Sequence, residues 1–164
     1  NSDFLAKEFA RGAQEAGNEV EYLRLAGKQI GFCKGCLACQ KTKKCVIRDD
    51  AVEIAEKVKN AHTLVFATPI YYYEMCGQMK TLLDRMNPLF SSEYAFREVY
   101  LLAASADGEE SAMDGAVKGM QGWVDCFEKA RFCGVLRGTG LTQPGEAPEK
   151  AELCREAYRM GQAV

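Results

Sequence analysis

The apolar residues of this chain repeat at helical spacing in some segments and form short, continuous runs in others. Helical spacing predicts five helices, and Asn1 or Ser2 is expected to cap the first of them, which Gly17 and Asn18 would end. A capping-box variant, Asp50-x-x-Glu53, is expected to open the second helix. The predicted helices lie at 2–16, 50–58, 75–86, 113–127 and 148–160.

Four strands are predicted, at Glu19–Leu25, Leu64–Ala67, Val99–Ala104 and Phe132–Leu136. The first has alternating character, whereas the others are continuous apolar runs, as expected of parallel strands that are covered on both faces. Strands and helices that alternate along a chain predict an α/β protein, with a doubly wound parallel sheet between two layers of helices. Right-handed crossovers normally place a strand before the first helix, so we expect one to be missing ahead of Asn1.

Composition fits a single domain over residues 1–164. A chain of 164 residues with 48% hydrophobic content can bury a sizeable core, and it has no repeats and no linker-like segment. A net charge of −2 and a sequence pI near 5.6 favour neither nucleic acid nor an anionic membrane as a partner. No apolar run approaches the roughly 20 residues that span a bilayer.

Four of the eight cysteines are crowded into thirteen residues, as Cys33-x-x-Cys36-x-x-Cys39-x5-Cys45. This spacing resembles the cysteine runs that hold iron–sulfur clusters, although the last gap is longer than in bacterial ferredoxins. Zinc usually takes two cysteine pairs with a longer gap between them, and free thiols are the third alternative. The spacing alone leaves a cluster, zinc and free thiols open. Crowded cysteines of this kind indicate metal or redox chemistry in the cytoplasm.

The other cysteines carry no pattern. We expect Cys76, Cys126, Cys133 and Cys154 to be small apolar residues of the core, because free cysteine is among the most buried residue types. On the helix predicted at 75–86, Lys80 and Asp84 stand four residues apart and are expected to form a surface ion pair.

Candidate ligand-binding residues follow the predicted strands, where open α/β sheets bind their ligands. The first helix offers its N-terminus at Ser2, which would favour a phosphate group. The segment from Thr68 to Tyr73 combines a rigid turn with three aromatic rings, which suits a flat heterocycle. No G-x-G-x-x-G motif is present, so a Rossmann dinucleotide site is not supported.

Three motifs in combination resemble the NADPH-dependent FMN reductase family, and within it the branch that includes the iron–sulfur flavoproteins. They are the cysteine run continuing to Asp49-Asp50, the sequence Ala67-Thr-Pro-Ile-Tyr-Tyr-Tyr73, and Gly77-Gln-Met-Lys-Thr-Leu-Leu-Asp-Arg85. The resemblance implies a flavodoxin-like fold with strand order 2-1-3-4-5 and FMN at the carboxyl edge. Members usually begin with a strand and a phosphate-binding loop. The resemblance therefore implies that the first strand and most of this loop are absent from the chain.

The same resemblance implies roles for individual residues. Asn1 and Ser2 would contact the FMN phosphate, the segment after the second predicted strand would line the isoalloxazine ring, and Ser105 would approach its far side. Cys33, Cys36, Cys39 and Cys45 would hold a 4Fe–4S cluster, on a loop expected at the flavin side of the sheet. The implied FMN-binding residues are Asn1, Ser2, Thr68, Pro69, Ile70, Tyr71, Tyr72, Tyr73 and Ser105.

We therefore expect an FMN-dependent oxidoreductase. It would accept electrons from NAD(P)H or a ferredoxin-like donor and pass them to a flavin, a quinone-like molecule or a protein acceptor. No catalytic side chain is assigned, because the flavin carries the chemistry. The resemblance also implies a homodimer or larger assembly. Two alternatives are a non-enzymatic iron–sulfur and flavin electron carrier, and a thiol- or zinc-stabilised binding protein on the same scaffold.

Overall fold

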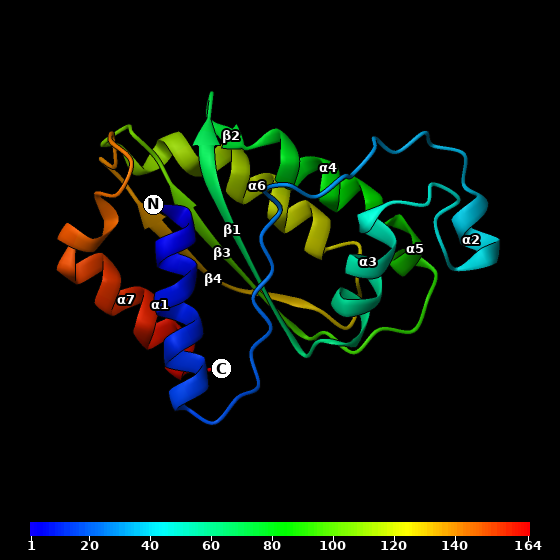
Figure 1. The fold of residues 1–164 in the computed structure, drawn as a ribbon, viewed down its shortest axis with the longest axis horizontal. Helices are drawn as coiled ribbons and strands as arrows, with labels where there is room; N and C mark the ends of the chain where they lie inside the picture. Colours follow the sequence, from blue (N-terminus) through cyan, green and yellow to red (C-terminus); the bar gives the residue numbers. More distant parts are fainter.

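A four-stranded sheet lies between two layers of helices in the computed structural model, which describes residues 1–164 (Figure 1). The strands are β1 (Thr63–Tyr71), β2 (Glu74–Met75), β3 (Glu98–Ala104) and β4 (Arg131–Gly138). The helices are α1 (Ser2–Glu15), α2 (Ala38–Thr42), α3 (Asp50–Asn60), α4 (Gly77–Arg85), α5 (Asn87–Phe90), α6 (Asp114–Val124) and α7 (Ala151–Gln162). Two 3-10 helices, Glu110–Met113 and Ala147–Glu149, precede α6 and α7.

The sheet order is β2-β1-β3-β4, and β1, β3 and β4 are mutually parallel. Pro69 stands beside Ala104, and Ala104 beside Gly138, so the three parallel strands end at one common edge. The predicted doubly wound α/β class is therefore confirmed. The order β1-β3-β4 matches the 3-4-5 part of the flavodoxin-like arrangement.

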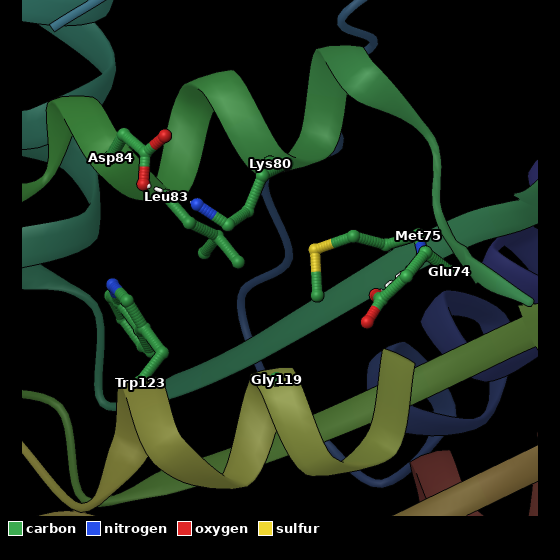
Figure 2. Close-up of a pocket in the computed structure, with 7 residues that line it drawn as sticks. All are labelled: Glu74, Met75, Lys80, Leu83, Asp84, Gly119 and Trp123. Carbon is green, nitrogen blue, oxygen red and sulfur yellow. Dashed lines mark hydrogen bonds and ion pairs between the residues drawn. The ribbon is translucent and has the colours of Figure 1, made fainter. Parts of the chain in front are cut away.

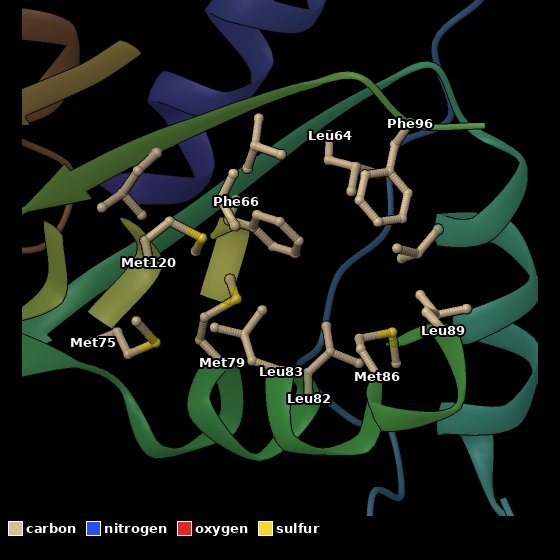
Figure 3. Close-up of a cluster of buried hydrophobic side chains, with 14 of the residues drawn as sticks. Leu64, Phe66, Met75, Met79, Leu82, Leu83, Met86, Leu89, Phe96 and Met120 are labelled. Carbon is tan, nitrogen blue, oxygen red and sulfur yellow. The ribbon is translucent and has the colours of Figure 1, made fainter. Parts of the chain in front are cut away.

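Two apolar cores lie on opposite faces of the sheet, as the strand alternation requires. Val99 and Leu101 of β3 face the larger core beneath α3, α4 and α6, whereas Leu102 and Ala104 face the smaller core beneath α1 and α7. Figure 3 shows the larger core, in which Met79, Leu82 and Leu83 of α4 lie opposite Leu64 and Phe66 of β1. Burial on both faces explains the continuous apolar run of β3. The expectation of cover on both faces is wrong for β1 and β4, which expose Val65 and Cys133.

The prediction of a strand at Glu19–Leu25 is wrong. This segment is extended, and Leu23 and Leu25 pack against the larger core, but its backbone forms no ladder with β1. A strand needs hydrogen bonds to a neighbour as well as a buried face. The fourth strand is instead β2, which pairs antiparallel with the end of β1 at Ile70 and Tyr71.

Three local predictions also need correction. Asp49, not Asp50, caps α3, because its side chain accepts a hydrogen bond from the backbone N–H of Ala51. Met75 belongs to β2 and not to the following helix. β1 continues to Tyr71 instead of ending at the Thr68-Pro69 step. Each helix falls short of the length and apolar character that a membrane span needs.

Candidate functional site

The carboxyl edge of the sheet brings the start of α1 next to the loops that follow β3 and β4. The side-chain amide of Asn1 donates to the carbonyl oxygens of Leu141 (3.4 Å) and Gln143 (2.9 Å), and its oxygen accepts from the N–H of Ala147 (3.0 Å). The loop after β4 is tied in turn to Ser105, whose carbonyl oxygen accepts from the N–H of Leu141 (2.8 Å). Residues 1 and 105 therefore belong to one connected edge.

Asn1 and Ser2 differ in what they can offer to an anion. The Asn1 side chain makes no cap bond to its own helix, because the loop after β4 engages both its oxygen and its nitrogen. The first backbone N–H groups of α1, at Ser2 and Asp3, have no carbonyl one turn earlier to bind. These N–H groups and the Ser2 hydroxyl are thus the free donors at this helix start, and Asn1 positions them.

Asp3 would repel a phosphate group at the same helix start if its charge were unopposed. Lys7 and Arg24 form ion pairs with it at 2.9 and 3.2 Å, and the Tyr22 hydroxyl donates to it at 2.7 Å. The hydrogen bonds from Lys7 and Tyr22 lower the pKa of Asp3. Burial, together with the hydrogen bond to Asp3, raises the pKa of Tyr22 to about 12. Two cations and one carboxylate leave a net positive charge beside the free N–H groups.

An exposed aromatic turn stands next to this edge. Tyr72 and Tyr73 form a two-residue hairpin loop between β1 and β2, and both have positive φ, at 49° and 67°. This is the backbone of a type I′ turn, which is usually made by Asn-Gly. Tyr71, Tyr72 and Tyr73 are 61%, 99% and 64% exposed. These three solvated rings, two of them on left-handed backbone, form an apolar surface that fits the flat ring system of a flavin.

The two hydroxyl groups predicted to line the flavin already have partners within the chain. Thr68 is fully buried; its hydroxyl donates to the Pro69 carbonyl (2.8 Å) and accepts from the N–H of Cys76 (3.0 Å). The Ser105 hydroxyl is buried and accepts from the N–H of Asp107 (3.0 Å). Thr68 and Ser105 therefore shape the edge, and the exposed groups are the tyrosine rings and backbone amides.

The four clustered cysteines line one small hollow of about 20 Å³ at the other end of α4. Gly35, Leu37 and Lys43 have positive φ, and these tight bends turn the loop inward around α2. The remaining walls come from Lys34, Leu37, Val46 and Ile47 of the loop and from Asp84, Arg85, Asn87 and Pro88. Cys39 is buried, Cys45 is half-buried, and Cys33 and Cys36 are exposed.

Hydrogen-bond donors surround these thiols. The Asn87 side-chain amide donates to Cys39 Sγ (3.3 Å), and the backbone N–H of Gly35 donates to Cys33 Sγ (3.5 Å). The hydrogen bond to Asp49 is the main cause of the raised pKa of Arg85, and the neighbouring Cys45 side chain adds to it. Four thiols with N–H donors fit the ligand set of an iron–sulfur cluster. No three His, Cys, Asp or Glu side chains converge as metal ligands, so a cluster would require the four cysteines to come closer together.

Arg85 and Asp49 hold the two ends of the cysteine loop together. The guanidinium donates to both Asp49 oxygens, at 2.6 and 2.8 Å, and to the carbonyl oxygens of Gly31 (2.7 Å) and Ile47 (3.1 Å). Asp49 also accepts from the N–H of Gly31 at 2.8 Å. Burial alone would raise the pKa of Asp49, but these hydrogen bonds outweigh it and lower the pKa overall.

Arg85 and Asp49 stand in the sequence motifs, but spacing assigned neither residue a role, and no pattern indicated Asn87. One signal was available for Arg85, because it follows Leu82 by three residues and lies on the apolar face of α4 with Met79. An arginine on a buried face needs a carboxylate partner. The partner itself lies 36 residues away in sequence, and spacing alone does not identify it.

The two candidate sites lie at opposite ends of α4, which corrects the expectation that the cysteine loop lies on the flavin side. Cys76, beside the aromatic turn, caps the start of the helix, and Arg85 ends it. Nine helical residues rise about 14 Å. Figure 1 shows the same separation, with α2 far from the strand ends near the N-terminus.

The other cysteines and a further groove lie outside the two candidate sites, and Cys76 is buried as predicted. Cys126 and Cys133 are exposed and Cys154 is half-buried, so their predicted burial is wrong, whereas Lys80 and Asp84 form the expected ion pair at 2.7 Å. Figure 2 shows a groove of about 500 Å³ between α4 and α6. It is lined by Glu74, Met75, Lys80, Leu83, Asp84, Gly119 and Trp123, none of which was a predicted site residue.

Comparison with known proteins agrees with this geometry. Residues 1–128 match the model of the NADPH-dependent FMN reductase family, and the chain belongs to that family. Membership supports FMN as its cofactor. The parallel sheet with a ligand edge at the strand ends is the architecture expected for such a protein.

Individual relatives carry related names. An iron–sulfur flavoprotein of Methanocaldococcus jannaschii is 37% identical over 89 residues, which are 54% of this chain and 46% of that protein. A Bacillus subtilis protein named an NAD(P)H-dependent FMN-containing oxidoreductase is 32% identical over 128 residues, covering 70% of this chain and 66% of the relative. The chain spans about half the length of the iron–sulfur flavoproteins it matches.

Solved structures share the fold. The NAD(P)H:quinone oxidoreductase of Methanothermobacter marburgensis superposes with a TM-score of 0.75 at 18% identity, covering 98% of this chain and 87% of its own. At this identity the likeness concerns the fold.

Proposed function

We propose that this protein is an FMN-dependent oxidoreductase that takes electrons from NAD(P)H or a protein donor. It would pass them to a flavin, a quinone-like molecule or a protein acceptor. The observation that carries the proposal is the aromatic turn at Tyr71–Tyr73, which follows β1 at the edge of the sheet where the start of α1 also lies. The family match over residues 1–128 supports the same cofactor.

The residues of the carboxyl edge bind and orient the cofactor in this proposal. The N–H groups of Ser2 and Asp3 hold the phosphate, with Asn1 fixing their position. Residues Thr68–Tyr73 carry the ring system, and the buried turn at Ser105 limits its far side. Bound FMN supplies the hydride and electron chemistry, so no side chain has to act as an acid, base or nucleophile.

We further propose that Cys33, Cys36, Cys39 and Cys45 hold a 4Fe–4S cluster. Their common hollow, the N–H donors at Cys33 and Cys39, and the iron–sulfur flavoprotein names of several relatives support this assignment. The four thiols lie on one loop, so no ligand from another element is needed. Such a cluster supplies single-electron transfer. The crowded cysteines also favour the reducing cytoplasm as the compartment, and we expect a homodimer or larger assembly.

Two measurements test the proposed function. Titration of the apoprotein with FMN should quench flavin fluorescence and saturate at one FMN per chain. The loaded protein should then oxidise NADPH or NADH when a quinone is present as acceptor. Absence of FMN quenching at micromolar protein contradicts the proposal. FMN binding without NAD(P)H oxidation, combined with electron exchange with a ferredoxin, identifies the non-enzymatic carrier instead.

A further inference from the structure

The guanidinium of Arg85 has one N–H group without a partner. Its side chain is completely buried, and its four terminal N–H groups go to Asp49 (two bonds), Gly31 and Ile47. An arginine has five N–H donors. The fifth, at Nε, is the one buried side-chain polar atom of the protein that makes no hydrogen bond.

Leaving this donor empty is unfavourable. A buried donor without an acceptor destabilises a protein by about 1–3 kcal/mol, and more when the group is charged. The hydrogen bonds from Arg85 to Asp49, Gly31 and Ile47 do not explain why Nε–H has no partner, because they use only the four terminal N–H groups. Arg85 also lines the hollow that contains the four cysteines. Nε–H is therefore the one donor that Arg85 has left for an occupant of that hollow.

We propose that Arg85 is a positioning residue whose Nε–H donates a hydrogen bond to sulfur in the occupied hollow and raises its reduction potential. The inference rests on the proposed cluster site. Hydrogen bonds to sulfur are among the factors that set the potentials of iron–sulfur centres. Reduction adds negative charge, and a buried cation with a free N–H donor in the wall of the hollow favours the reduced state. Removing this donor should therefore lower the potential.

The test compares midpoint potentials in anaerobically assembled holoprotein, followed by electron paramagnetic resonance. Arg85→Lys keeps the positive charge but removes Nε–H and the planar guanidinium group that binds Asp49 through two hydrogen bonds. The expected result is a shift to lower potential by about 59 mV, which corresponds to a tenfold change in a one-electron equilibrium. The matched control is Arg48→Gln, which removes an exposed arginine of the same loop and should leave the potential unchanged.

A second measurement uses the unmodified side chain, in case Arg85→Lys does not assemble the cluster. Protein labelled with ¹⁵N-arginine should show magnetic coupling between the reduced cluster and one ¹⁵N nucleus with an exchangeable proton. The coupling should persist in Arg48→Gln. A wild type that contains the cluster but shows no such coupling, or whose potential equals that of Arg85→Lys, overturns the inference and leaves the proposed function standing. A wild type without iron overturns the inference and the cluster together.

Discussion

Arg85 and Asp49 form a two-point ion pair that joins the end of α4 to the start of α3 and closes the cysteine loop between them. The Arg85 side chain is fully buried, and the Asp49 side chain is 13% exposed. Breaking a buried pair on one side leaves the other charge without compensation. The pair therefore links the stability of the fold to the position of the cysteines.

Replacing Asp49 by Asn should lower the free energy of unfolding by about 3–5 kcal/mol, because Arg85 would keep its charge without a carboxylate. Urea denaturation followed by circular dichroism measures the change. The control is Asp84→Asn, which breaks the exposed Lys80–Asp84 pair and should change stability by no more than about 0.5 kcal/mol. An equal decrease in the free energy of unfolding of the two variants would contradict the prediction that the buried Arg85–Asp49 pair matters more than the exposed Lys80–Asp84 pair.

The same pair predicts an acid dependence of stability. The pKa of Asp49 is lower in the folded protein than in the unfolded chain, where it is about 3.9. Its contribution is therefore fully present above about pH 5, begins to fall near the unfolded pKa, and is lost as the pH falls through the folded pKa. Between about pH 5 and pH 2.5, wild type should lose stability more steeply than Asp49→Asn. Parallel pH profiles for the two proteins would contradict this prediction.

Substitutions in the aromatic turn at Tyr72 and Tyr73 should raise the stability of the protein and weaken its binding of FMN. Replacing Tyr72 by Asn and Tyr73 by Gly supplies the residues that a type I′ turn prefers, so stability should rise by about 1 kcal/mol. The same change removes two exposed rings, and the dissociation constant of FMN should rise about tenfold, equivalent to roughly 1.4 kcal/mol. Thermal unfolding and fluorescence titration measure the two effects. Unchanged FMN affinity would remove these tyrosines from the site.

The contact between α1 and α7 depends on glycine. A Cβ atom at Gly161 would lie 2.0 Å from the carbonyl oxygen of Phe9, closer than atoms can approach. Gly161→Ala should therefore separate the helices and lower stability by about 3 kcal/mol. Gly122, on α6, has no atoms near its Cβ position, and Gly122→Ala should instead raise stability by about 0.5–1 kcal/mol. Urea denaturation of both variants tests the difference in sign.

Sequence patterns predicted the parallel strands because their signal is local. The run Val99–Ala104 is apolar throughout, and the structure buries it on both faces as β3. The pattern at Glu19–Leu25 also identified which side chains face the core, since Leu23 and Leu25 do so. A strand additionally needs a hydrogen-bonded neighbour, which the pattern of one segment does not reveal.

The sequence predicted the residues of the candidate site, but it did not predict how they are arranged in space. The cysteines and the aromatic turn were visible as clusters of residue types. The turn at Tyr72 and Tyr73 lacks the glycine and asparagine that mark a hairpin, so β2 was missed. The Arg85–Asp49 pair, and the separation of the two sites along α4, depend on contacts between residues far apart in sequence.

The most direct test of the proposed flavin and iron–sulfur oxidoreductase is the iron and acid-labile sulfide content per FMN of protein assembled without oxygen. Wild type should contain about four iron and four sulfide, Cys36→Ser should lose them, and Cys126→Ser should retain them. Cys126 is an exposed thiol on another part of the chain, so it is a matched control. Equal iron in all three proteins, or a wild type that binds zinc and no iron, would contradict the assignment.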